Sequence, residues 1–245
     1  STSTQSIRSI ASVLLAIFDV NTGHNSIVPQ ISQCRNDDGS NVKFTVEIFD
    51  TNRSPIMGAA LLNDILLRRN QPVQLQEGNV VKSFPIGIVG VPRSSLATPL
   101  SVLGGVNDLM IVSNAASSSS LSQTDEFPLF GRTQATTDAA AKSVVSYFHD
   151  VLNATHLGVM YVNGVFGGSY QRSVQDAASK LNITTVSIAL PQGTSTEDAR
   201  SALSLLKDTG FRYFVGVFFR AEFETVMPLA KEIGITGEEY FWIFS

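Results

Sequence analysis

The chain has 245 residues, of which 43% are hydrophobic and 16% are charged, and its formal net charge is −4. These values are typical of a globular protein large enough to bury a core, and the lack of a basic excess argues against nucleic-acid binding. Cys34 is the only cysteine and the three histidines are scattered, so the sequence offers neither a disulfide framework nor a metal-ligand spacing. The longest apolar runs are much shorter than the ~18 residues of a membrane-spanning helix.

The N-terminal third predicts a helix, a strand and a second helix. Apolar residues recur at helical spacing over 7–18 and predict a helix with a buried stripe. Over 42–48 apolar and polar residues alternate, which predicts a strand with one polar face. Ser54 and Pro55 supply an N-cap and a first residue for the next helix, and the polar segment 71–82 predicts a loop.

Two short apolar runs, 86–89 and 109–112, flank a helix-length segment and predict a βαβ unit. In an open parallel sheet, small ligands bind beyond the carboxyl ends of the strands, where Ser94, Ser95 and the run 117–120 follow the two strands. Ser94 and Ser95 also open a helix, whose free N–H groups and dipole favour a carboxylate. A second interpretation is that these serines only cap the helix and form turns.

Extended and helical segments alternate from residue 127 to the end of the chain. The expected elements are an extended piece at 127–133, helices at 137–151, 170–181, 196–209 and 222–233, and strands at 157–162, 183–190, 212–218 and from 240. This alternation predicts parallel sheets covered by helices. Because so many crossovers would strain one small sheet, we expect two lobes that divide near Thr133.

A glycine-rich turn at 163–169 follows the predicted strand at 157–162. Its glycines do not have the spacing of a nucleotide-binding turn, so we expect them to permit a tight turn or the close approach of a ligand. The sequence contains no GxSxG elbow, and its spacing nominates no Ser/His/Asp set. We therefore expect no enzyme activity and no cofactor.

Six motifs between residues 86 and 244, together with LLAI in the predicted first helix and the predicted strand that ends at Asp50, carry a resemblance to a known family that covers nearly the whole chain. In chain order they are IGIVGVPRSS, SNAASSSSLS, EFPLFGRT, LGVMYVNGVFGGS, FRYFVGVFFRAEFETVMPLAKEIG and EEYFWIF. Together they resemble the extracellular ligand-binding region of class C G-protein-coupled receptors, most closely that of the metabotropic GABA receptors. The same module occurs in natriuretic-peptide receptors, ionotropic glutamate receptors and bacterial amino-acid-binding proteins.

The resemblance implies an α/β fold of the two-lobed, type I periplasmic-binding-protein-like kind. Each lobe would contain a mostly parallel sheet with helices on both faces, with residues 1–132 in the first lobe and 133–245 in the second. The chain begins almost at once with a helix and stops within the apolar run 240–244. We therefore expect truncation at both ends, with the first lobe lacking its first strand and C-terminal part and the second lobe incomplete.

The resemblance also assigns ligand-binding residues in the first lobe. Ser94 and Ser117 match hydroxyls that hold the carboxylate of an amino-acid-like ligand, and Ser95 and Ser118 stand beside them. Donors already fixed at a helix start suit a carboxylate, so the residue pattern and the resemblance agree. Arg93, where the relatives carry a small residue or cysteine, would add an attraction for anions.

In the second lobe, the resemblance assigns the ligand-capping positions to Phe166 and Phe219. The glutamate and GABA receptors carry Tyr there, so this chain keeps the rings and loses the hydroxyls. Core packing is the second interpretation of these two residues. Gln134, which stands where the GABA receptors carry His, is a further candidate contact.

The resemblance implies a dimer formed through the first lobe, located on the extracellular side of the plasma membrane. A heterotrimeric G protein would be reached through a transmembrane region outside this chain. Sequons at Asn52, Asn153 and Asn182 fit secretion, although chance gives about as many. Two alternatives stay open: the soluble amino-acid-binding protein of a transporter, and the sensor domain of a receptor guanylyl cyclase.

Overall fold

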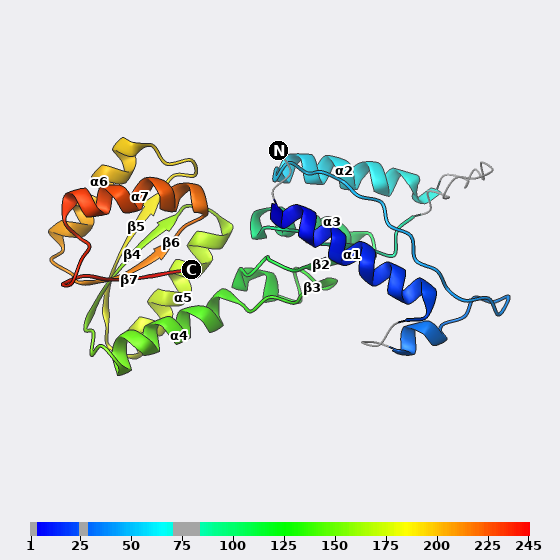
Figure 1. The fold of residues 1–245 in the computed structure, drawn as a ribbon, viewed down its shortest axis with the longest axis horizontal. Helices are drawn as coiled ribbons and strands as arrows, with labels where there is room; N and C mark the ends of the chain where they lie inside the picture. The colour runs from blue at the N-terminus through cyan, green and yellow to red at the C-terminus, as the bar shows by residue number, and fades with distance from the viewer. Residues whose placement is uncertain (1–3, 25–28, 71–83) are drawn as a thin grey trace. The chain divides into compact units, whose positions relative to one another are not determined.

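The structure is a computed structural model that describes residues 4–24, 29–70 and 84–245 (Figure 1). The chain divides into two compact units. One contains Ser1–Asn52 and Ala60–Phe84, and the other contains Arg53–Ala59 and Pro85–Ser245. The predicted loop at 71–82 lies outside the described residues.

The first unit contains helix α1 (Thr4–Thr22), the 3-10 helix η1 (Pro29–Gln33), the larger part of α2 (Pro55–Leu67) and the 3-10 helix η2 (Arg68–Asn70). The predicted first helix is confirmed, but its stripe is not buried, since Ile7 is 55% and Phe18 is 61% exposed. The reason lies within the unit, whose described residues form no sheet against which the stripe could pack.

The predicted strand at 42–48 is wrong. Near it lies only an isolated antiparallel bridge between Arg35 and Asn41. The side chain of Asn21 bonds both backbone groups of Phe44, donating from Nδ2 to the carbonyl over 2.7 Å and accepting the N–H over 2.8 Å. The Asn21 side chain thus supplies the two hydrogen bonds to Phe44 that a neighbouring strand would otherwise supply.

Helix α2 begins as predicted. The Ser54 hydroxyl oxygen accepts the N–H of Met57 over 3.2 Å, and Pro55 is the first helical residue. This is the N-cap geometry expected from the Ser-Pro pair.

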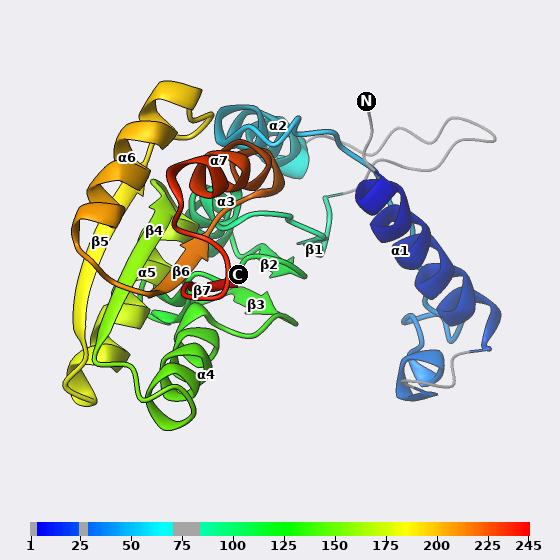
Figure 2. The same cartoon turned by 60° about the vertical axis from the view of Figure 1, so that its left-hand side comes forward.

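The second unit starts with a parallel three-stranded sheet in the order β1-β2-β3 (Figure 2). Its strands are β1 (Gly87–Val89), β2 (Met110–Ser113) and β3 (Phe130–Arg132). Helix α3 (Ser94–Val106) connects β1 to β2, which confirms the predicted βαβ unit. Leu96 and Leu100 of α3 are buried together with Ile111 of β2.

A parallel four-stranded sheet in the order β5-β4-β6-β7 follows. Its strands are β4 (His156–Val162), β5 (Thr184–Leu190), β6 (Tyr213–Val217) and β7 (Phe241–Phe244), and its helices are α4 (Thr137–Asp150), α5 (Val165–Lys180), α6 (Thr196–Asp208) and α7 (Arg220–Ile233). Together with the three-stranded sheet, this arrangement confirms the predicted α/β class with parallel sheets flanked by helices.

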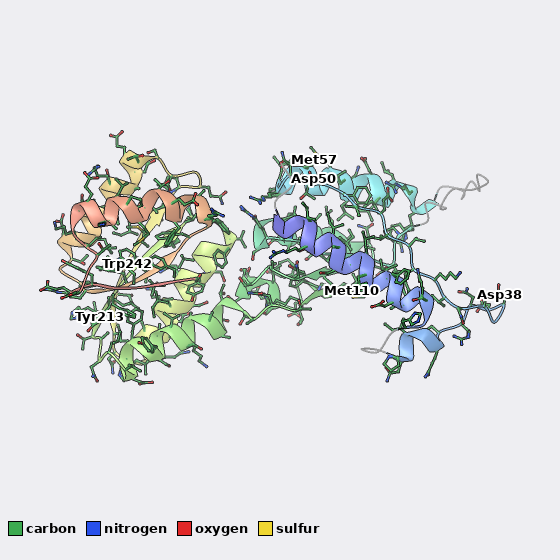
Figure 3. All side chains as sticks on the ribbon, viewed as in Figure 1. Asp38, Asp50, Met57, Met110, Tyr213 and Trp242 are labelled. Carbon is green, nitrogen blue, oxygen red and sulfur yellow. The ribbon has the colours of Figure 1, made fainter. Side chains whose placement is uncertain are left out.

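Alternating strand residues supply a core on each face of this sheet. Leu157 and Val159 of β4 join the cluster under α4 and α5, whereas Met160 and Val162 join the cluster under α6 and α7. In Figure 1 the two helix pairs lie on opposite sides of the strands. Figure 3 labels one residue of each cluster, Tyr213 on the α4–α5 side and Trp242 on the α6–α7 side.

Helix α5 begins five residues earlier than predicted, inside the glycine-rich segment. A Cβ atom on Gly167 would lie 1.9 Å from the carbonyl oxygen of Val162, the last residue of β4. Glycine therefore lets the first helical turn lie directly against the strand end. The expected turn at 163–169 is reduced to Asn163 and Gly164 before the helix starts.

Candidate functional site

The serines that follow β1 and β2 lie in contact with one another. Ser94, the first residue of α3, is 2% exposed, and its Oγ accepts the N–H of Ser118 over 3.1 Å. The Ser118 hydroxyl is in turn 2.8 Å from the Ser120 hydroxyl. The N–H groups of Ser94 and Ser95 open the helix and have no partner inside it. These donors suit an anion, although the hydroxyl oxygens of Ser94 and Ser118 already have hydrogen-bond partners within the protein.

The remaining polar residues of the predicted site differ in burial. Ser117 is buried, and its carbonyl accepts the N–H of Thr137 over 2.8 Å. Ser95 is half-buried. Gln134 is exposed, in the segment between β3 and α4.

The two predicted aromatic residues also lie in contact. Phe166 is in the first turn of α5 and Phe219 is the N-cap residue of α7, and their ring centroids are 5.6 Å apart. Both side chains are half-buried, and Phe166 packs against the core cluster under α4 and α5. The contact therefore fits a ligand-facing role and a core role alike.

Arg93 joins two parts of the candidate site. One is the serine side, at the start of α3 and after β2, and the other is the aromatic side, at the starts of α5 and α7. The guanidinium carbon of Arg93 lies 4.3 Å from the centroid of the Phe219 ring, within the range of a cation–π interaction. Burial, and to a lesser extent the charge of Arg53, lower the pKa of Arg93, whereas the charge of Glu222 raises it. The loop after β1 and the start of α7 are thereby in contact.

Glu222, in the first turn of α7, is a residue that the sequence analysis passed over. It is 7% exposed, its Oε1 accepts the N–H of Gly193 over a long 3.4 Å, and its Oε2 has no hydrogen-bond partner among the described residues. The sequence did contain one signal for Glu222 as a site residue. It is acidic, and it lies three positions after Phe219, beyond the carboxyl end of a parallel strand. Its burial could not be read from the sequence.

A buried hydroxyl cluster, formed by Ser119, Thr137 and Ser169, fastens the segment after β2 to the four-stranded part. The N–H of Ser119, at the start of the 3-10 helix η3 (Ser119–Ser122), donates to Thr137 Oγ1 over 3.1 Å and to Ser169 Oγ over 3.0 Å. The hydroxyls of Ser119 and Thr137 lie 2.9 and 3.0 Å from that of Ser169, which is 1% exposed.

A cavity of about 530 Å³ opens beside this cluster. Ser120 and Glu126 line it from the segment after β2, and Asn163 and Arg172 line it from the end of β4 and from α5. Ser120, the last residue of the predicted run 117–120, lines it, whereas Ser94, Ser95, Phe166 and Phe219 do not. The cavity therefore adjoins the predicted site at Ser120, whose hydroxyl lies 2.8 Å from that of Ser118.

Within the described ranges, no group of three or more His, Cys, Asp or Glu side chains could hold a metal ion. None of the helices in the described part of the chain has the length and apolarity to cross a membrane.

Comparison with known proteins identifies the family. The model of a family described as the receptor family ligand binding region matches residues 29–245, which is most of the chain and includes both sheets. No curated protein matches the chain. The family match agrees with the α/β architecture and with polar and aromatic residues gathered at the carboxyl ends of parallel strands. The chain therefore belongs to the family of receptor ligand-binding regions.

Proposed function

We propose that this ligand-binding region takes a small, amino-acid-like ligand between two lobes, residues 1–132 and 133–245, and signals by closing them. The three-stranded sheet falls in the first range and the four-stranded sheet in the second, which supports the division. The observation that carries the proposal is the Arg93–Phe219 contact. Through it, the serines at the start of α3 and the aromatic residues at the starts of α5 and α7 come together as one set.

In this proposal Ser94, Ser95, Ser117 and Ser118 hold the ligand carboxylate, and Phe166 and Phe219 cover the ligand from the second lobe. Closure follows because a ligand that touches both lobes stabilises the closed form through contacts that the open form lacks. The protein takes no part in catalysis.

The membrane context belongs to the same proposal. We infer an extracellular receptor of the class C G-protein-coupled type, similar to the metabotropic GABA receptors, which dimerises through the first lobe and acts on a heterotrimeric G protein. The basis is the motif resemblance together with the family match over residues 29–245.

The test is calorimetric titration of the purified protein with a panel of α- and ω-amino acids. Replacing Ser94 or Ser117 with Ala should weaken the binding of the best ligand by about 1 to 3 kcal/mol, because each change removes a hydrogen bond to a charged group. Ser143→Ala is the control, since that hydroxyl is exposed and bonds only the Ala139 carbonyl of its own helix. Unchanged affinity in both Ser94→Ala and Ser117→Ala would reject the carboxylate assignment.

A further inference from the structure

Two of the three sequons lie on neighbouring turns at one end of the four-stranded sheet. Asn153 to Thr155 leads from α4 into β4, and Asn182 to Thr184 leads from α5 into β5. The two strands are paired, and the N–H of Thr184 donates to the carbonyl of Thr155 over 2.9 Å. Both turns lie at the amino ends of these strands, whereas the candidate site lies beyond the carboxyl ends.

The two turns share one arrangement of side chains. In each, the asparagine is exposed and has a positive φ angle, 49° at Asn153 and 56° at Asn182, and the threonine two positions later is exposed as well. The residue between them is buried in the core cluster under α4 and α5, with Ala154 at 2% and Ile183 at 5% exposure. The apolar residue thus holds the turn against the core, and the asparagine and the threonine on either side of it face solvent.

The side-chain amides of these two asparagines are unbonded. Among the described residues, no hydrogen bond involves the side chain of Asn153 or Asn182, and the Thr155 hydroxyl has only the neighbouring ring nitrogen of His156, at 2.9 Å. A glycan is bulky and solvated, so the folded protein can carry one only where the acceptor lies on the surface. An exposed, unbonded amide on a turn between a helix and a strand meets that condition.

The third sequon, Asn52 to Ser54, has a different structure. Its middle residue, Arg53, is exposed, so no buried side chain anchors this turn. The Ser54 hydroxyl oxygen already accepts the N–H of Met57 over 3.2 Å. Pro55 follows directly and biases the backbone of Ser54 toward extended conformations. The segment that a modifying enzyme would have to bind is therefore stiffer here, and its hydroxyl is in use.

We propose that Asn153 and Asn182 are N-glycosylated and that Asn52 is not. The inference rests on the extracellular location in the proposed function, because the modification takes place in the secretory pathway. In the reaction, the side-chain amide nitrogen attacks the anomeric carbon of an oligosaccharide carried on a lipid pyrophosphate. A carbon–nitrogen bond forms, the carbon–oxygen bond to the pyrophosphate breaks, the lipid pyrophosphate leaves and the amide gives one proton to solvent. No group is oxidised or reduced.

The experiment expresses the whole chain behind a cleavable secretion signal, in cultured eukaryotic cells that glycosylate a reporter sequon in a tag ahead of Ser1. Mass spectrometry after digestion with a peptide N-glycosidase, which converts each glycosylated Asn to Asp, then reads every site. Glycans are expected at Asn153 and Asn182, with Asn52 unmodified.

The threonines supply matched controls, because changing them leaves the positive-φ asparagines in place. Thr155→Ala should lose the glycan at Asn153 alone, and Thr184→Ala should lose the glycan at Asn182 alone. The thermal unfolding midpoint of the glycosylated protein should not lie below that of the double variant, because the sugars extend into solvent.

Three results would overturn the inference. They are an unmodified Asn153 or Asn182 beside a modified reporter, a glycan at Asn52, and a lower unfolding midpoint for the glycosylated protein. Since the added signal directs the chain into the secretory pathway, the outcome does not depend on the ligand or on the natural location. The proposed function can therefore fail in the calorimetric titration of Ser94→Ala and Ser117→Ala while this inference stands, and the reverse also holds.

Discussion

The serine side and the aromatic side of the candidate site are held in different ways. On the serine side, Ser94 accepts from Ser118, and Ser119 donates to Ser169, so that the polar groups satisfy one another. On the aromatic side, rings and a close backbone approach fix the geometry, and Glu222 keeps an unpaired oxygen.

The difference bears on how a ligand is recognised. The Ser94 hydroxyl can donate its O–H to a ligand carboxylate while its Oγ still accepts the Ser118 N–H, so the hydroxyl is already held in position before a ligand binds. We therefore expect the serine side to orient the ligand and the aromatic side to cover it.

The largest effect is expected from Gly167→Ala on the aromatic side. The added Cβ would lie 1.9 Å from the Val162 carbonyl oxygen, so either β4 or the first turn of α5 must move. The loss of unfolding free energy should be about 3 kcal/mol or more, measured by urea denaturation. Gly168→Ala is the control, because nothing lies within 4 Å of its added Cβ, and it should be neutral or stabilising by up to about 1 kcal/mol. Equal losses in the two variants would contradict the close-packing account.

On the serine side the most sensitive position is Ser169. Its hydroxyl receives the Ser119 N–H and lies within hydrogen-bond distance of the Ser119 and Thr137 hydroxyls. Ser169→Ala should lower the unfolding free energy by about 1 to 3 kcal/mol, because buried polar groups lose a partner. The exposed Ser143→Ala serves as the reference in the same urea titration. An unchanged midpoint for Ser169→Ala would mean that the cluster does not hold the segment after β2.

A smaller effect is expected from the contact that joins the two sides. A double-mutant cycle with Arg93→Met and Phe219→Leu should give a coupling of about 1 kcal/mol in unfolding free energy, since both changes keep apolar bulk and remove the cation–π pair. Arg212 over Tyr240, at 5.4 Å and exposed, should show a weaker coupling in a parallel cycle. Zero coupling between Arg93 and Phe219 would mean that their contact does not contribute to the stability of the protein.

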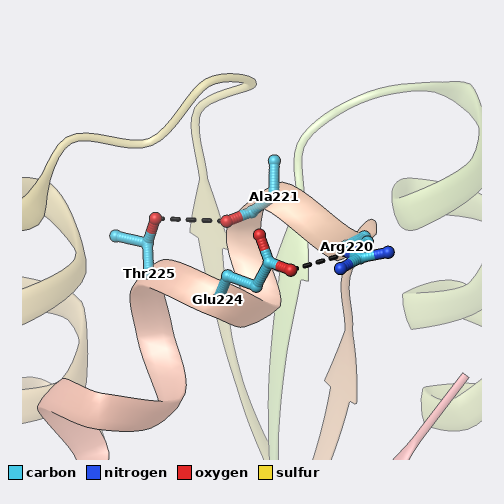
Figure 4. A network of polar contacts seen from close by, with 4 residues as sticks. All are labelled: Arg220, Ala221, Glu224 and Thr225. Carbon is cyan, nitrogen blue, oxygen red and sulfur yellow. Dashed lines mark hydrogen bonds and ion pairs between the residues drawn. The ribbon is translucent and has the colours of Figure 1, made fainter.

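The smallest effect is expected at the surface pair Arg220–Glu224 (Figure 4). The pair is exposed, and its order, Arg before Glu, opposes the helix dipole, so Glu224→Gln should barely move the urea midpoint. Whatever shift occurs should vanish in high salt, because screening acts fully on exposed charges. A shift as large as that of Ser169→Ala would show that surface charge on α7 stabilises this part more than its buried contacts suggest.

The elements of the four-stranded part could be predicted because their information is local. Near-continuous apolar runs in β4 and β6 are typical of strands buried on both faces of a parallel sheet, and helical spacing in α6 and α7 is typical of helices that pack on such a face. The strand predicted at 42–48 was wrong because an alternating pattern does not reveal whether a neighbouring strand is present. The backbone groups of Phe44 instead bond the side chain of Asn21. The start of α5 was predicted too late because the close approach of Gly167 to Val162, which permits the earlier start, depends on packing.

The candidate site shows the same limit. Ser94 and Phe219 could be named from motifs, but the contact between Arg93 and Phe219 spans 126 positions and has no trace in either segment. The burial of Glu222 is likewise a product of the fold, since the surrounding sequence marks it only as an acidic residue in a first helical turn. Sequence patterns name candidates, and the structure decides which of them meet.

The central claim is that a ligand binds where the start of α3 meets the start of α7. The most direct measurement places 4-fluorophenylalanine at position 219 in one sample and at the fully buried position Phe148 in another, and follows each fluorine resonance during titration with a ligand found by calorimetry. The account predicts that the resonance at 219 shifts and saturates at the same concentration as the heat of binding, while that at 148 stays still. Saturable heat with an unmoved resonance at 219 would contradict it and move the site elsewhere, with the cavity beside Ser120 and Arg172 as the first place to search.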